Sequence, residues 1–260
     1  MAVIIQALLV ALVVTVPAPR KEGLQSFGGD YSVSFLGIPV ASSTFNSTFE
    51  GDSFSVKGVL SAAGLAQLFD DTQGSMSSAG RFAGDTTQPT AFRVDYTEGK
   101  KSKMTSIRFK GGAVTKAENV PPLKKRGRDW VPVRKSHLQT VTDPLSATLV
   151  RADSLAEVCG RTIRIFDGEF RADLTLSPES SGPMSVQGFE GETVTCRVGF
   201  APVAGYRKGR KALDYLKNHS EIRIAFAPLG TTGVYALIRA TVGTQIGTVT
   251  IQAQRFEATK

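Results

Sequence analysis

The sequence contains few of the residues from which catalytic and metal sites are usually built. It has two histidines, His137 and His219, and two cysteines, Cys159 and Cys196, among 260 residues. Their spacing matches no metal-ligand pattern, and the Cys-x-x-Cys, Gly-x-Ser-x-Gly, phosphate-loop and His-Glu-x-x-His motifs are absent. We therefore expect a protein without cofactor, metal ion or catalytic activity. An enzyme remains an alternative if the fold gathers polar groups that the sequence keeps apart.

Aromatic residues are scarce around the positive charge. The chain has 31 Lys and Arg against 23 Asp and Glu, a net charge of +8, with one Trp. Single-stranded nucleic acid is usually held by aromatic side chains interleaved with basic ones, so we expect no nucleic-acid partner. The clustered basic residues fit either solvated loops or a site that contacts anions. The candidate anion-contacting residues are Lys124, Lys125, Arg126, Arg128, Arg207, Lys208, Arg210 and Lys211.

Long hydrophobic runs are missing except at the amino end. Residues 2–16 are apolar apart from Gln6 and Thr15, which is shorter than the roughly 20 residues that a spanning helix needs. This length is typical of a secretory signal peptide, which we assign to residues 1–22. No Lys or Arg precedes the run and Pro19 follows Ala18, so a start upstream of Met1 and an uncleaved anchor are alternatives. Residues 23–260 are then expected to form one β domain.

The two cysteines form a natural pair if the chain is exported, because oxidising compartments permit disulfides. A bridge between Cys159 and Cys196 would close a loop of 37 residues. On the chain-entropy model, such a loop stabilises the folded state by about 3.5–4 kcal/mol. We expect this disulfide to have a structural role.

Apolar and polar residues alternate in short runs separated by Gly, Asn or Asp. This pattern predicts a mainly β fold, in which a single large meandering antiparallel sheet curls into an open or incomplete barrel. The fourteen predicted strands cover residues 31–38, 41–49, 53–60, 73–83, 91–97, 103–110, 113–117, 161–166, 169–176, 184–189, 193–200, 220–227, 233–241 and 247–256.

Two or three short helices interrupt this pattern. Apolar residues recur at helical spacing in residues 64–71, and Asp143-Pro144 offers a cap before a helix at residues 145–152. Residues 207–218 fit either a short basic helix or an exposed loop. Between the halves, prolines make residues 121–132 a connection instead of a central strand.

Several short motifs resemble a family of bacterial envelope proteins, domain of unknown function 3108. They are Tyr-Ser-Val-Ser-Phe-Leu-Gly-Ile-Pro-Val-Ala at 31–41, Gly-Leu at 64–65, Phe-Asp-Asp-Thr at 69–72, Tyr96 with Lys100-Lys101, Pro-Pro at 121–122, Asp-Pro-Leu-Ser-Ala at 143–147, Cys-Gly at 159–160 and Phe-Asp-Gly at 166–168. The resemblance implies a periplasmic protein of a Gram-negative bacterium with no established activity. The amino end departs from it by lacking a basic start.

These observations favour a periplasmic, non-enzymatic protein that supports the cell envelope. We expect its concave sheet to bind a lipid or a lipoprotein acyl chain, while its basic loops contact the membrane surface. Proteins that carry lipoproteins use a similar curved sheet, although fold alone does not establish function. The alternative is a structural or scaffolding module that binds another envelope protein or a cell-wall component.

Overall fold

Two antiparallel meanders join edge to edge in the structure, a computed structural model that describes residues 23–64, 73–99, 101–124 and 126–259. The first meander comprises β1 (Gln25–Phe35), β2 (Ile38–Glu50), β3 (Ser53–Ala62), β4 (Gln73–Ala83), β5 (Thr86–Glu98), β6 (Lys101–Lys110) and β7 (Ala113–Val120). The second comprises β10 (Arg161–Phe166), β11 (Arg171–Val186), β12 (Phe189–Ala204), β14 (Ile222–Pro228), β15 (Val234–Thr244) and β16 (Gly247–Thr259).

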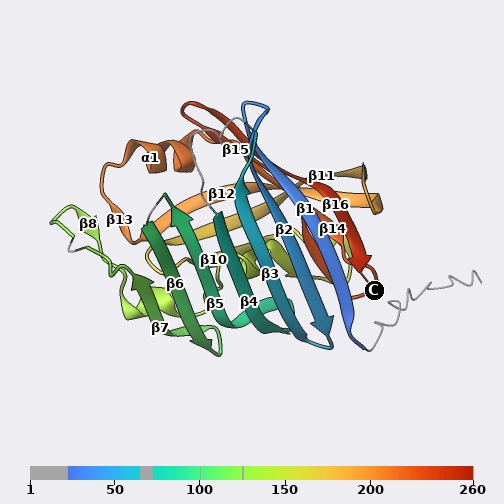
Figure 1. The fold of residues 1–260 in the computed structure, drawn as a ribbon, viewed down its shortest axis with the longest axis horizontal. Coiled ribbons are helices and arrows are strands. Elements are labelled where there is room, and N and C mark those ends of the chain that lie inside the picture. The colour runs from blue at the N-terminus through green and yellow to red at the C-terminus, as the bar shows by residue number, and fades with distance from the viewer. Residues whose placement is uncertain (1–22, 65–72, 100, 125, 260) are drawn as a thin grey trace, which may run out of the picture.

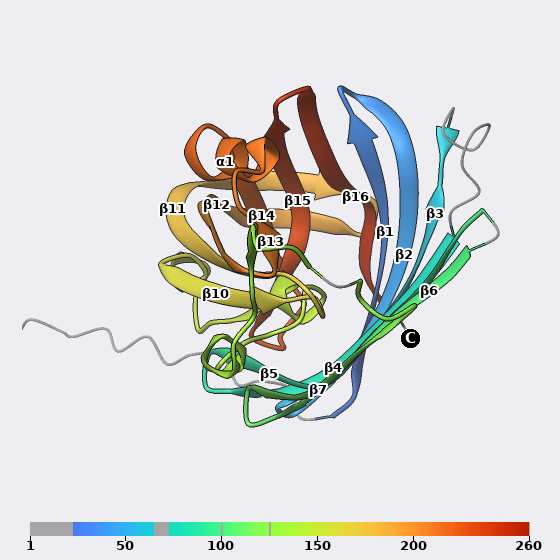
Figure 2. The ribbon, with the colours of Figure 1, turned by 90° about the vertical axis from the view of Figure 1, so that its left-hand side faces the viewer.

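The last strand along the chain pairs with the first. Strand β16 pairs antiparallel with β1, so the hydrogen-bonded order runs β10-β11-β12-β14-β15-β16-β1-β2-β3-β4-β5-β6-β7. Strands β1–β7 form one wall and β10–β16 the other, and the sheet curls without closing (Figures 1 and 2). Between the edge strands β7 and β10, Thr142 donates its amide hydrogen to the carbonyl of Arg164 at 2.8 Å, and the Val141 amide hydrogen reaches Gly112 at 2.9 Å.

The connection between the two meanders enters the concave side of the sheet. It contains β8 (Trp130–Val131), η2 (Lys135–Leu138), η3 (Ser146–Thr148), β9 (Leu149–Arg151) and η4 (Leu155–Glu157). Strand β9 pairs with β15, and both η3 and β9 contact β5 on the opposite wall. Strand β13 (Tyr206–Arg207) pairs with β8, and α1 (Lys211–Asn218) follows it. Among the described residues, no helix is long and apolar enough to cross a membrane.

The predicted fold class is confirmed, with two local corrections. The helix predicted at residues 145–152 is wrong: a 3-10 turn, η3, leads directly into strand β9, because pairing with β15 stabilises an extended backbone there. The separate strand predicted at 184–189 is also wrong, since β11 continues to Val186 and the turn follows. The predicted signal peptide at 1–22 and, beyond Gly64, the helix at 64–71 lie outside the described residues. The boundary at residue 23 stays a prediction.

The buried side chains form two hydrophobic clusters. The Phe-rich cluster contains eight buried phenylalanines, and both walls and the connection contribute to it. Its phenylalanines are Phe27, Phe49, Phe54, Phe82, Phe92, Phe109, Phe166 and Phe256. The disulfide cluster surrounds the predicted bridge between Cys159 and Cys196, which is present with its Cα atoms 5.7 Å apart. Strands β9 and β14 contribute side chains to both clusters.

Candidate ligand-binding cavity

A cavity of about 240 Å³ lies against the Phe-rich cluster, between β1–β3, β15, β16 and the connection. Its lining is mainly aromatic and aliphatic, and the polar side chains among the described lining residues are four hydroxyls. The lining comprises Phe27, Gly28, Gly29, Tyr31, Val33, Ser43, Phe45, Ser47, Val56, Leu60, Leu145, Thr148, Leu149, Leu229, Ala236, Leu237, Ile251 and Phe256. No carboxylate or amine stands among these residues, so the cavity favours an apolar occupant.

Two glycines leave the space that the aromatic lining occupies. A Cβ atom on Gly58 would lie 2.4 Å from the Phe45 ring, and one on Gly29 would lie 2.8 Å from the Tyr31 ring. Both separations are shorter than real carbon contacts, so any larger residue would push the ring out of position. The rings of Tyr31 and Phe45 meet edge to face with centroids 5.7 Å apart.

Tyr31 presents its ring to the cavity while its hydroxyl is satisfied elsewhere. The Tyr31 hydroxyl donates a hydrogen bond to the Leu237 carbonyl at 2.7 Å, which ties β1 to β15 across β16. Burial raises the pKa of the Tyr31 phenol well above its ordinary value. The phenol therefore stays protonated at neutral pH, and its fixed ring forms part of the apolar cavity lining.

The connection supplies one wall of the cavity, and a buried carboxyl group holds it in place. Asp143 is fully buried, and its Oδ1 accepts the amide hydrogens of Leu145 and Ser146 at 2.9 Å each. Its Oδ2 accepts hydrogen bonds from the Ser146 hydroxyl at 2.7 Å and from the Ser78 hydroxyl on β4 at 2.8 Å. The Asp143 latch, formed by Asp143, Ser146 and Ser78, thus fixes Leu145 and Leu149 where they line the cavity.

Burial also changes the ionisation of the latch. Removal from water raises the pKa of the Asp143 carboxyl above its ordinary value, and the four hydrogen bonds partly oppose this effect. All four partners of this carboxyl belong to the protein: two amide hydrogens and two hydroxyls. The latch therefore supports the cavity wall.

The cavity is closed at one end and more exposed at the other. Phe27, Val56 and Phe256 are buried, whereas Val33, Leu60 and Ile251 are half-buried. Along β1 and β16 the half-buried residues lie nearer the β1–β2 and β15–β16 turns. The open end of the cavity therefore faces these two turns.

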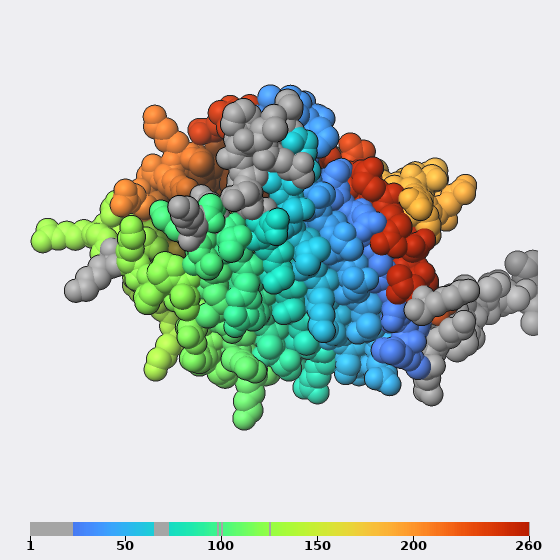
Figure 3. All heavy atoms as spheres, viewed as in Figure 1, coloured from blue at the N-terminus to red at the C-terminus, as the bar shows by residue number. Residues whose placement is uncertain are grey.

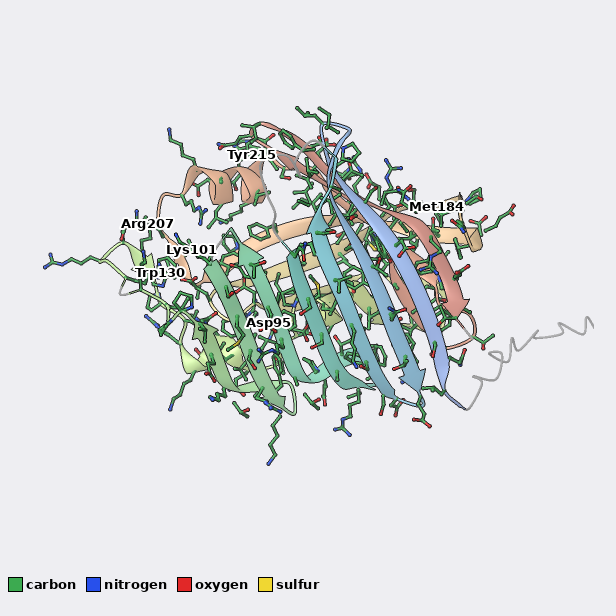
Figure 4. The ribbon with its side chains drawn as sticks, viewed as in Figure 1. Asp95, Lys101, Trp130, Met184, Arg207 and Tyr215 are labelled. Atoms are coloured by element: carbon green, nitrogen blue, oxygen red, sulfur yellow. A yellow bond between two sulfur atoms is a disulfide. The ribbon has the colours of Figure 1, made fainter. Side chains whose placement is uncertain are left out.

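The two predicted groups of basic residues come together at the β8–β13 pair, and none of them lines the cavity. Strand β8 pairs with β13, which places Trp130 opposite Arg207 in the register (Figure 4). The Arg126 guanidinium lies 4.3 Å from the centre of the Trp130 ring and forms an ion pair with Glu169, while Arg207 pairs with Asp129 at 2.9 Å. The exposed members of these groups are Lys124, Arg126, Arg128, Arg207, Lys208, Arg210 and Lys211.

The proximity of these groups was not predicted, because it depends on a two-residue strand pair between distant segments. Lys125 lies outside the described residues. The assignment of this set to anion contact stays a prediction. The individual cavity residues were also missed, since alternation identifies which face of a strand is buried but not where the filling is incomplete. The adjacent glycines at 28 and 29 were the available signal.

A comparison with protein families identifies a family whose function is unknown. The family described as "Protein of unknown function (DUF3108)" matches residues 30–254. No curated protein matches the chain.

Two solved structures resemble the chain over most of its length. The β-barrel-like protein of domain of unknown function DUF1849 from Brucella abortus shares 8% identity at a TM-score of 0.49, covering 93% of this chain and all of that one. A "putative lipoprotein" from Parabacteroides distasonis shares 8% identity at a TM-score of 0.35, covering 92% and 97% of the two chains. These similarities are too distant to transfer a function.

Proposed function

The chain belongs to the DUF3108 family of proteins of unknown function, and we propose that it binds one alkyl chain, such as the acyl chain of a lipid or lipoprotein, in this cavity. The observation that carries the proposal is the composition of the cavity lining. Among the described lining residues, the only polar side chains are hydroxyls. Burying apolar ligand surface there stabilises a complex by about 25 cal/mol for each Å² removed from water.

The size of the cavity limits the ligand. Pockets for drug-sized molecules usually measure about 300–1,000 Å³, and this cavity of about 240 Å³ is smaller. A single chain fits such a volume better than a complete lipid with its headgroup. A polar headgroup would then remain at the half-buried end, near Val33, Leu60 and Ile251.

We also propose that the protein is exported and acts in the periplasm without catalysing a reaction. The disulfide supports an oxidising compartment, because reducing compartments rarely preserve such bridges. Thiol labelling of protein taken directly from its host cell tests this point. Free thiols at Cys159 and Cys196 would contradict export.

The binding proposal is tested by two matched substitutions on adjacent residues of β3. Leu60 lines the cavity, whereas Val59 points to the outer face and is 57% exposed. Leu60→Trp should weaken the binding of dodecanoic acid, measured by calorimetry, by at least about tenfold, because the indole fills the open end. Val59→Trp should leave the affinity unchanged.

Equal affinities of the two variants for dodecanoic acid would contradict the proposal. It would also be contradicted if the wild-type protein binds no dodecanoic acid and native mass spectrometry of protein isolated from its host shows no bound alkyl-chain ligand. The unfolding transition of each variant should be measured in parallel, to confirm that both proteins are folded. An empty cavity together with a stoichiometric protein partner would favour the scaffolding alternative.

A further inference from the structure

Two neighbouring hairpin turns expose large apolar side chains at one end of the sheet. Leu36 and Ile38 at the β1–β2 turn are 63% and 54% exposed, and Ile246 at the β15–β16 turn is 78% exposed. The Leu36 amide hydrogen bonds the Thr248 carbonyl at 2.9 Å, which holds the two turns together. Figure 3 shows both tips at the upper edge of the molecule. Residues 35–39 and 244–248 contain no charged side chain.

An apolar track leads from these tips into the cavity. Val33 pairs with Ile251, and both line the cavity. Two residues closer to the tips, Phe35 pairs with Val249 on the same faces of the two strands. The exposed tip residues are therefore continuous with the half-buried end of the cavity.

Basic residues lie beside the tips, on α1 and just before it. In Figure 1, α1 stands at the upper left next to the β15–β16 hairpin, and the β8–β13 pair lies lower, at the left margin. The segment 207–217, which includes most of α1, carries five basic side chains against one acidic side chain, Asp214, and one of the five, Arg207, pairs with Asp129. At the opposite ends of the strands the charge is mixed: Asp52 after β2 and Asp85 after β4 form ion pairs with Arg151 and Arg161, and the β6–β7 turn follows Lys110.

We propose that this end of the protein docks on an anionic phospholipid membrane. Leu36, Ile38 and Ile246 would enter the interfacial layer of the bilayer, while the basic side chains of segment 207–217 contact the lipid headgroups. Docking in this orientation points the open end of the cavity toward the lipid. The inference thereby deepens the proposed function, on which it rests, by naming the surface from which the cavity would take its ligand.

Vesicle co-sedimentation of the full chain tests the docking surface. Wild-type protein should bind vesicles of phosphatidylglycerol and phosphatidylcholine more tightly than vesicles of phosphatidylcholine alone, and salt should weaken the binding. The double variant Leu36→Ser with Ile246→Ser should bind the anionic vesicles at least about tenfold more weakly, since two exposed apolar side chains no longer insert. Every variant carries the same amino end, so the apolar residues 2–16 contribute equally throughout.

The matched control is Leu24→Ser, which removes an equally exposed leucine at the opposite end of β1. It should bind vesicles like wild type. Docking is overturned if wild type ignores anionic vesicles, if the double variant binds them as tightly as wild type, or if Leu24→Ser is weakened equally. Dodecanoic acid binding without vesicles is measured separately on the same proteins. If no protein binds dodecanoic acid but the vesicle results are as expected, the proposed cavity ligand is contradicted and the docking surface is supported.

Discussion

The disulfide cluster and the Phe-rich cluster share strands β9 and β14, yet they differ in their relation to the candidate cavity. In the disulfide cluster, Val158, Leu176, Cys196 and Phe226 are each at most 1% exposed. In the Phe-rich cluster, buried phenylalanines lie beside a hollow of about 240 Å³, and the residues at its open end are half-buried. The lining of this hollow includes many residues of the Phe-rich cluster and none of the disulfide cluster.

The difference follows from how each region is held together. The disulfide cluster is crosslinked by a bridge between residues 37 positions apart. This bridge stabilises the second meander and does not depend on the cavity. The hollow is instead bordered by a connection that depends on the Asp143 latch and on glycines that make space for rings. A protein that keeps a cavity open forgoes packing energy there, and the compact cluster contributes stability elsewhere.

The largest expected effect comes from removing the crosslink. Replacing both Cys159 and Cys196 by alanine should lower the free energy of unfolding by about 3.5–4 kcal/mol, because the unfolded chain regains the freedom of a 37-residue loop. Denaturant titration measures the change, and reductant should shift wild type but not the variant. Under native conditions the variant should still bind dodecanoic acid. A loss of stability below about 1 kcal/mol would show that the bridge is not a main support of this cluster.

A pair of leucine truncations tests the contrast in packing directly. Leu176→Ala in the disulfide cluster should cost about 2–5 kcal/mol of unfolding free energy, because Leu176 is 1% exposed and its truncation opens a void among buried neighbours. Leu60→Ala should cost less than about 1.5 kcal/mol, since Leu60 is half-buried and already borders a hollow. Chemical denaturation of the two variants gives both values. Similar costs would mean that the two clusters are equally well packed.

The strands were predictable because their information is local. Alternation in segments such as residues 53–60 identifies a half-buried strand, and Asp167-Gly168 marks the turn between β10 and β11. There the Asp167 carboxylate accepts the amide hydrogens of Glu169 and Phe170, at 2.9 and 2.7 Å. Neighbouring residues alone determine these strands and turns, so they could be predicted from the sequence without knowledge of the fold.

The connection was not predictable in the same way. Asp143-Pro144 does cap a turn, but the residues after it form strand β9 because β15, more than eighty residues later, offers a pairing edge. The hydroxyl of Ser78 on β4 likewise completes the latch from a distant strand. Both contacts position the cavity wall, and neither can be predicted from the residues next to it in the sequence.

The smallest predicted effect is a pH dependence of the Asp143 latch. Burial raises the pKa of Asp143 in the folded state above the ordinary value of 3.8, so the folded protein binds this proton more tightly than the unfolded chain. The contribution of Asp143 to stability is therefore fully present below pH 3.8 and declines as the pH rises toward the folded-state pKa. The slope is at most about 1.4 kcal/mol per pH unit, and the contribution becomes constant above that pKa.

The variant Asp143→Asn isolates this contribution, since the amide cannot titrate but keeps the size of the carboxyl. Its Oδ1 can still accept the Leu145 and Ser146 amide hydrogens. Denaturant titrations of wild type and variant across pH 3–8 measure the difference in unfolding free energy, from which the titrations of all other shared groups cancel. The difference should shift in favour of the variant as the pH rises from about 4, and then level off. A shift in favour of wild type over this range would mean that the four hydrogen bonds outweigh burial and hold the Asp143 pKa below its ordinary value.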